Sequence, residues 1–256
     1  QVQGGADILD VNVGHPEIDE KKMMVRVLKA IQSVCDVPLQ IDSTKPEVIE
    51  AGLRYYNGKP ILNSVNGEEQ SLATVLPLVK KYGASVVGLA LDENGIPKTA
   101  EGRFEIAKRI VERAEAVGID RKDVYIDCLT LTVSAEQAAC RQTLEALHRV
   151  KTELGCKTCL GVSNISFGLP NRELVNRTFL TMAMEQGLDL PIINPNVESM
   201  TGAVRAFRVL NGIDKNSLEF INAYNDAVPA APVKKADSNV DIFAAVYNGL
   251  KNEGAA

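Results

Sequence analysis

The 256-residue sequence contains no long uninterrupted run of apolar residues, so no transmembrane helix is expected. It has no basic stretch interleaved with aromatic side chains, and its 28 Lys and Arg against 33 Asp and Glu give a net charge of −5. Nucleic acid is therefore not an expected partner. It also lacks the phosphate-binding patterns G-x-x-x-x-G-K-[ST] and G-x-G-x-x-G. Its five cysteines are not spaced like a secreted disulfide framework, and we expect a cytoplasmic protein.

What the sequence does contain is a series of apolar runs, most of which end in Asp or Asn. Each run is followed by a stretch with helical periodicity, which predicts parallel strands joined by crossover helices. The predicted strands are residues 8–12, 39–42, 61–63, 85–91, 124–127, 158–163 and 191–194. Seven such units in a chain of this length predict a TIM (β/α)8 barrel that lacks its first strand here.

The chain is expected to change character near residue 226. We predict the barrel over residues 1–226 and an Ala/Pro-rich linker over residues 227–238. Residues 239–256 have the pattern of a short amphipathic helix, which cannot bury its apolar face alone. We interpret them as the start of a truncated helical domain.

Four polar residues end four different predicted strands: Asp42, Asn63, Asp127 and Asn164. In a barrel such side chains converge at one mouth. A carboxylate accepts two parallel hydrogen bonds and a carboxamide both donates and accepts, so the set suits a flat, donor-rich heterocycle such as a pterin. The alternative is that these residues only cap helices or turn the chain. Four together favour a binding site.

Several segments carry a resemblance to a known family. They are residues 9–14, 40–44, 62–64, 96–98, 125–127 and 161–172, of which the last is the most specific. The chain from residue 1 to about residue 212 resembles the pterin-binding domain of cobalamin-dependent methyltransferases. That family includes the folate domain of methionine synthase and the methyltetrahydrofolate:corrinoid protein methyltransferase. The family's glutamate-containing first strand has no counterpart in this chain.

The resemblance implies a TIM barrel that binds 5-methyltetrahydrofolate and transfers its N5 methyl group to cob(I)alamin on a corrinoid-binding domain or protein. It implies that Asn164 contacts N5 as the catalytic residue and that Arg172 supports its loop. The substrate-binding set is Asn12, Asp42, Asn63, Asp127, Asn164 and Arg172. No metal site is expected in the chain itself, and a homodimer is left open.

The chemistry is consistent with these residues. A tertiary amine is a poor leaving group, so methyl transfer needs stabilisation of N5 as it becomes protonated. A positioned amide can supply it without titrating. Because the cobalt is the nucleophile, the protein's task is orientation and electrostatics.

Two alternative functions stay open. Dihydropteroate synthase shares the barrel and the pterin site, but is expected to carry a basic Ser-Arg-Lys-type motif where this chain reads Ser163-Asn164-Ile165. We rank it lower. The other alternative is a non-catalytic module that binds a pterin or docks a corrinoid protein.

The remaining candidate residues favour ordinary structural roles. Cys156 and Cys159 form a C-x-x-C pattern without a second cysteine pair, and we interpret them as buried thiols. His148 fits packing or the surface, and His15 could reach the mouth without being catalytic. Lys98 is either solvated or meets the glutamate tail of a folate.

Overall fold

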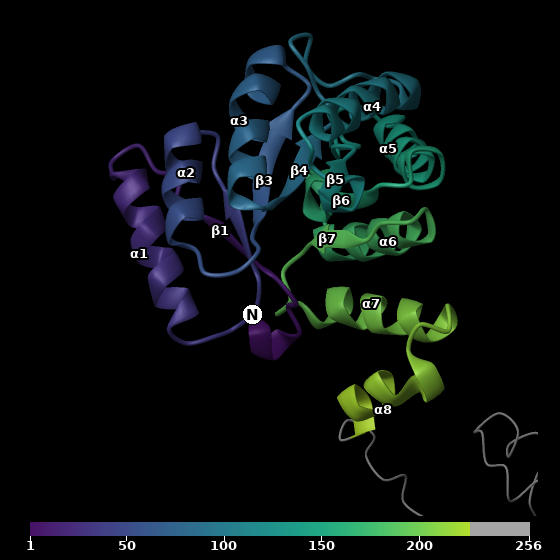
Figure 1. Cartoon of the computed structure of the whole chain (residues 1–256). Coiled ribbons are helices and arrows are strands. Elements are labelled where there is room, and N and C mark those ends of the chain that lie inside the picture. The colour runs from purple at the N-terminus through teal and green to yellow at the C-terminus, as the bar shows by residue number, and fades with distance from the viewer. Residues whose placement is uncertain (226–256) are drawn as a thin grey trace, which may run out of the picture.

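The computed structural model describes residues 1–225, in which parallel strands alternate with helices around a barrel (Figure 1). The strands are β1 (Leu9–Asn12), β2 (Leu39–Asp42), β3 (Ile61–Asn66), β4 (Ser85–Leu89), β5 (Val124–Asp127), β6 (Lys157–Gly161) and β7 (Leu190–Ile192). The helices are α1 (Glu20–Gln32), α2 (Pro46–Tyr55), α3 (Glu69–Tyr82), α4 (Ala100–Ala116), α5 (Ala139–Arg149), α6 (Arg172–Glu185), α7 (Glu198–Leu210) and α8 (Leu218–Tyr224).

The seven strands lie in chain order in one sheet, and every neighbouring pair is parallel. This confirms the predicted TIM barrel with seven βα units. In the described part of the chain, β1 and β7 are the two ends of the sheet and do not pair with each other. A cavity of about 750 Å³ lies at this seam, lined by the segment before β1, by β7 and by α7.

Side chains alternate between the two faces of each strand, as the period of two requires. Leu39, Ile41 and Leu62 face outward and belong to the large core between the strands and their helices. Ile61 and Val87 belong to a small separate cluster, to which Leu190 and Ile192 of β7 also contribute at the inner face of the barrel. The polar residues of β1 and β2 share this inner face.

The helix ends follow local sequence signals. Asp19 caps α1 by accepting the backbone N–H of Lys22 at 3.1 Å, and Thr99 caps α4 by accepting that of Gly102 at 3.1 Å. Gly83 ends α3 with φ of 65°, a left-handed conformation that glycine adopts without steric cost.

Some element boundaries differ from the predicted ones. The strand predicted over residues 158–163 ends at Gly161, and residues 162–166 form a 3-10 helix. Asn171 then turns the backbone with φ of 47°, and Arg172 begins α6. Helix α8 was not predicted from the sequence.

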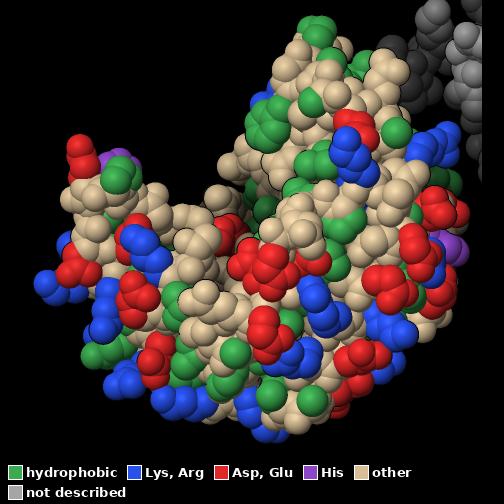
Figure 2. All heavy atoms as spheres, turned by 90° about the horizontal axis from the view of Figure 1, so that it is seen from above, with side chains coloured by type: hydrophobic (Ala, Val, Ile, Leu, Met, Phe, Trp, Pro, Cys, Tyr) green, Lys and Arg blue, Asp and Glu red, His purple; other side chains and the backbone are tan. Residues whose placement is uncertain are grey.

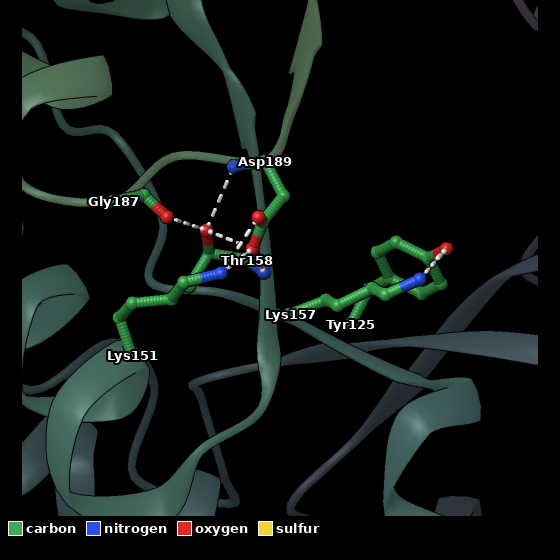
Figure 3. A network of polar contacts seen from close by, with 6 residues as sticks. All are labelled: Tyr125, Lys151, Lys157, Thr158, Gly187 and Asp189. Carbon is green, nitrogen blue, oxygen red and sulfur yellow. Dashed lines mark hydrogen bonds and ion pairs between the residues drawn. The ribbon is translucent and has the colours of Figure 1, made fainter. Parts of the chain in front are cut away.

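A polar network ties β6 to β7 at their amino ends, opposite the mouth (Figure 3). The Thr158 hydroxyl donates to the Gly187 carbonyl at 2.7 Å and accepts the Asp189 N–H at 3.0 Å. The Asp189 carboxylate accepts the Thr158 N–H at 3.0 Å and pairs with Lys151 at 2.6 Å. This end of a barrel usually serves stability, and the network fixes the register of the two strands.

Within residues 1–225, no helix is both long enough and apolar enough to cross a membrane. The linker predicted over residues 227–238 and the helical segment over residues 239–256 lie outside the described residues.

Candidate functional site

Three of the predicted site residues form a row across the ends of β1, β2 and β3. Asn12 lies opposite Asp42 in the β1–β2 register, and Asp42 lies opposite Asn63 in the β2–β3 register. The Asn12 side-chain amide donates to Asp42 Oδ2 at 2.9 Å. Burial raises the pKa of Asp42 above its ordinary value, and the hydrogen bond from Asn12 partly opposes this shift.

Asp127 ends β5 and is the most buried of the predicted site residues. Its side chain accepts the Leu129 N–H at 2.7 Å and also a hydrogen bond from the backbone of Gly161. Burial raises its pKa to about 6, although both hydrogen bonds and the nearby Arg103 favour the charged form. The carboxylate is therefore ionised at neutral pH and partly protonated near pH 6.

Asn164 lies on the 3-10 helix that follows β6 and is exposed. A Cβ atom on Gly161 would lie 3.1 Å from Asn164 Nδ2, closer than side chains normally approach. The missing side chain at Gly161 thus gives the Asn164 amide room across the end of β6. Since Asp127 bonds to the Gly161 backbone, Asn164 and Asp127 share this neighbour.

Arg172 holds the segment around Asn164 in place. Its Nε donates to Ser166 Oγ at 3.0 Å, and its Nη2 donates to the Ser163 carbonyl at 2.9 Å. Its guanidinium stacks on the ring of Phe167 with a centroid distance of 4.4 Å. Arg172 is thus bonded to residues on both sides of Asn164.

The carbonyl of Phe167 is also fixed, by the loop that follows β5. The hydroxyls of Thr132 and Ser134 both donate to it at 2.7 Å. The ring itself stays 50% exposed at the rim. The loops after β5 and β6 are therefore joined on the side of the mouth that carries Asn164.

All six predicted residues lie at or just beyond the carboxyl ends of the strands, in two groups. Asn12, Asp42 and Asn63 form the row on β1 to β3, and Asp127, Asn164 and Arg172 belong to β5, β6 and the start of α6. Figure 2, seen from above Figure 1, shows a broad notch between two lobes of the molecule. The arrangement can offer carboxylate acceptors and amide groups to a planar ligand.

Two further polar residues of the inner face were missed in the sequence analysis. Gln40 Nε2 donates to Asp10 Oδ1 at 2.7 Å, and burial raises the pKa of Asp10. The signal was present, because Asp10 lies two residues before Asn12 and Gln40 lies two residues before Asp42. The period of two puts each pair on the same face of its strand.

The weaker candidates lie where structural roles explain them. Cys156 and Cys159 are buried free thiols, and burial raises the pKa of both, which keeps them protonated. His15, His148 and Lys98 are exposed. No group of three His, Cys, Asp or Glu side chains suited to a metal ion occurs among the residues described.

A sequence profile of the family described as pterin binding enzyme matches residues 1–194. The chain belongs to the pterin-binding enzyme family. Methionine synthase of Mycobacterium leprae (strain TN) is 35% identical over 207 residues, which cover 76% of this chain and 17% of that protein. Methylcorrinoid:tetrahydrofolate methyltransferase of Eubacterium limosum is 30% identical over 230 residues, 88% of this chain and 84% of that protein. The resemblance inferred from the motifs is confirmed at family level.

Solved structures of dihydropteroate synthases share the fold. Dihydropteroate synthase of Xanthomonas albilineans in complex with 7,8-dihydropteroate has a TM-score of 0.63 at 19% identity, covering 82% of this chain and 81% of that one. The dihydropteroate synthase of Stenotrophomonas maltophilia has a TM-score of 0.67 at 19% identity, covering 83% and 84%. At these identities the likeness establishes the barrel and leaves the reaction open.

Proposed function

We propose that this chain binds 5-methyltetrahydrofolate at the carboxyl-end mouth and transfers its N5 methyl group to cob(I)alamin carried by a corrinoid-binding domain or protein. The observation that carries the proposal is the similarity to a methylcorrinoid:tetrahydrofolate methyltransferase at 30% identity and to a methionine synthase at 35% identity. The polar residues at the mouth support it, because they suit a pterin.

In this proposal the pterin ring is held by the two carboxylates and the row on β1 to β3. Asp42 and Asp127 each accept hydrogen bonds from neighbouring N–H and NH2 groups of the ring. Asn12 orients Asp42 through its 2.9 Å hydrogen bond. Asn63, beside Asp42 in register, offers an amide that both donates and accepts.

Asn164 is proposed to act at N5. Its amide hydrogen-bonds N5 and stabilises the nitrogen as it becomes protonated and releases its methyl group, and an amide does so without changing its own charge. Arg172 keeps the carbonyl of Ser163 and the hydroxyl of Ser166 in place on either side of it. Because Asn164 is already held in position, less of the activation barrier is spent on reorienting it during methyl transfer.

The rim around Asn164 suits an approaching partner. Asn164 is exposed and the Phe167 ring is 50% exposed, so the proposed N5 position is open from outside. Cob(I)alamin bound by such a partner supplies the nucleophile. The names of the two relatives do not decide the direction, and the same residues serve transfer either way by microscopic reversibility.

The test is a methyl-transfer assay with the purified chain, 5-methyltetrahydrofolate and cob(I)alamin, followed by the absorbance of methylcobalamin. We expect methylcobalamin to form and to depend on the protein. Folate binding without turnover would instead support a non-catalytic module. Release of dihydropteroate from the pterin pyrophosphate and p-aminobenzoate would support dihydropteroate synthase, whose fold the chain shares.

A further inference from the structure

Arg103 is a buried cation that lies behind the most buried carboxylate of the mouth. It comes from the first turn of α4, and none of its side chain is exposed (0%). Its Nε donates to the Pro97 carbonyl at 2.9 Å. Its Nη1 donates to the carbonyls of Cys128 and Leu129 at 3.2 and 3.0 Å and to the Thr143 hydroxyl at 2.6 Å. One side chain thus connects the loops after β4 and β5 with α5.

This cation has only neutral hydrogen-bond partners. Its four contacts are three carbonyls and a hydroxyl, and its Nη2 atom is buried without a partner among the described residues. A buried charge with no direct counter-ion is costly to a fold. Asp127 and Glu136 are the carboxylates whose charges stabilise it from a distance. Carbonyl binding alone would not require a group that is permanently charged.

One peptide group joins Arg103 to Asp127. The peptide between Cys128 and Leu129 presents its carbonyl to Arg103 Nη1 at 3.2 Å and its N–H to Asp127 Oδ1 at 2.7 Å. Leu129 adopts a left-handed backbone with φ of 60°, which is unusual for a leucine and requires support from its surroundings. Aligned hydrogen bonds of this kind strengthen one another inside a protein.

We propose that Arg103 is a positioning residue for the pterin site: it orients the Cys128–Leu129 peptide toward Asp127, and its charge keeps that carboxylate ionised for the ligand. Any effect of Arg103 on methyl transfer rests on the proposed function. The Pro97 contact extends it, because Arg103 then links the loop beside Lys98 to the same carboxylate. Through this side chain, a ligand that orders the loop after β4 also affects the loop after β5.

The other titratable groups around Asp127 do not replace this charge. Cys128, next in the chain, and Cys159 on β6 both interact with the carboxylate, and burial raises the pKa of each thiol. Both are therefore neutral when Asp127 titrates. Leu89, opposite Asp127 on β4, carries no charge. Arg103 is the charged side chain that favours ionised Asp127.

The direct test is the titration of the Asp127 carboxyl carbon by NMR in the folded protein. In the unaltered chain we expect a midpoint near the pKa of about 6. Arg103→Met removes the charge and should raise the midpoint by about one pH unit. Arg103→Lys keeps the positive charge, so its Asp127 midpoint should stay close to that of the unaltered chain. Thr143→Val, which removes one contact of Arg103 and leaves its charge, should not move the midpoint.

A folded Arg103→Met variant whose Asp127 titrates at the original midpoint would overturn the proposal. If that variant does not fold, Arg103→Gln decides by the same titration, because its amide can still donate to the carbonyls without a charge. Binding of 5-methyltetrahydrofolate at pH 6 should weaken about fivefold in the uncharged variant. If the unaltered chain binds no folate, the proposed function fails, while the NMR titration still decides the role of Arg103.

Discussion

Asn12 and Asp42 are joined by a 2.9 Å hydrogen bond across the first two strands of the barrel. The bond uses one carboxylate oxygen, Oδ2, and fixes the plane of the group. Asn63 is the neighbour of Asp42 in the β2–β3 register. Preorganised acceptors lose less entropy when a ligand binds.

From this pair we predict a graded effect on folate binding. Asp42→Asn should weaken the affinity for 5-methyltetrahydrofolate about a hundredfold, because a charge-assisted pair of hydrogen bonds is lost. Asn12→Ala should weaken it about fivefold, because it only frees the carboxylate to rotate. Isothermal titration calorimetry measures both. Asp36→Asn, an exposed change before β2, is the matched control; equal losses in all three variants would contradict the role of Asp42.

Asp127 predicts a pH dependence of folate binding. Because burial raises its pKa to about 6, the affinity should rise from pH 5 to pH 7 with a midpoint near that value. Asp127→Asn should bind weakly and with little dependence on pH in this range. Fluorescence or calorimetric titrations across the range measure the profile. A flat profile in the unaltered chain would show that ligand binding does not require ionised Asp127.

The same residue affects the stability of the ligand-free barrel. Its pKa is higher in the folded state than the ordinary 3.8, so its stabilising contribution is complete below about pH 3.8 and is lost as the pH rises through about 6. Relative to Asp127→Asn, the unaltered chain should lose about 3 kcal/mol of unfolding free energy over that window. Urea unfolding at several pH values measures the difference, and bound folate should reduce it.

Asn164→Ala should separate catalysis from binding. We expect the rate of methyl transfer to fall by about a hundredfold or more, because the amide acts on N5 only as its charge changes. The affinity for folate should fall by less than about threefold. Single-turnover kinetics and equilibrium titration measure the two quantities. Equal losses in rate and affinity would mean that Asn164 only binds the substrate.

The network at the amino ends of β6 and β7 predicts a variant that loses stability without losing folate binding. Thr158→Val removes the hydroxyl that contacts Gly187 and Asp189 and should lower the unfolding free energy by about 1–2 kcal/mol. Folate binding by the folded fraction should not change, because the network lies at the other end of the barrel. Thr152→Val, on an exposed helical surface, is the control for a lost hydroxyl.

The strands and the polar residues at their carboxyl ends could be predicted from local sequence because both depend on short patterns. Apolar runs that end in Asp or Asn mark β2 and β5 correctly, and parallel strands necessarily bring their carboxyl ends together. The family resemblance then singled out Asn164 and Arg172, whose neighbourhood in the fold follows from the bonds that Arg172 makes to Ser163 and Ser166. Their proposed roles stay predictions.

Other features depend on contacts between distant segments. Arg103 lies on a helix rich in charged residues, and its burial is decided by carbonyls supplied by two other loops. Strand β6 ends at Gly161 because a 3-10 helix follows it directly, and the alternation of apolar and polar residues does not predict that helix. Asp10 and Gln40 were visible in the alternation of their strands but were counted as ordinary strand residues.

The seam between β1 and β7 has a consequence for hydrogen exchange in this chain. Asp10 and Gln40 line the cavity at the seam. Within residues 1–225, β1 and β7 each have a pairing strand on one side only, so their outer backbone amides in this chain should exchange hydrogen faster than those of the central strands.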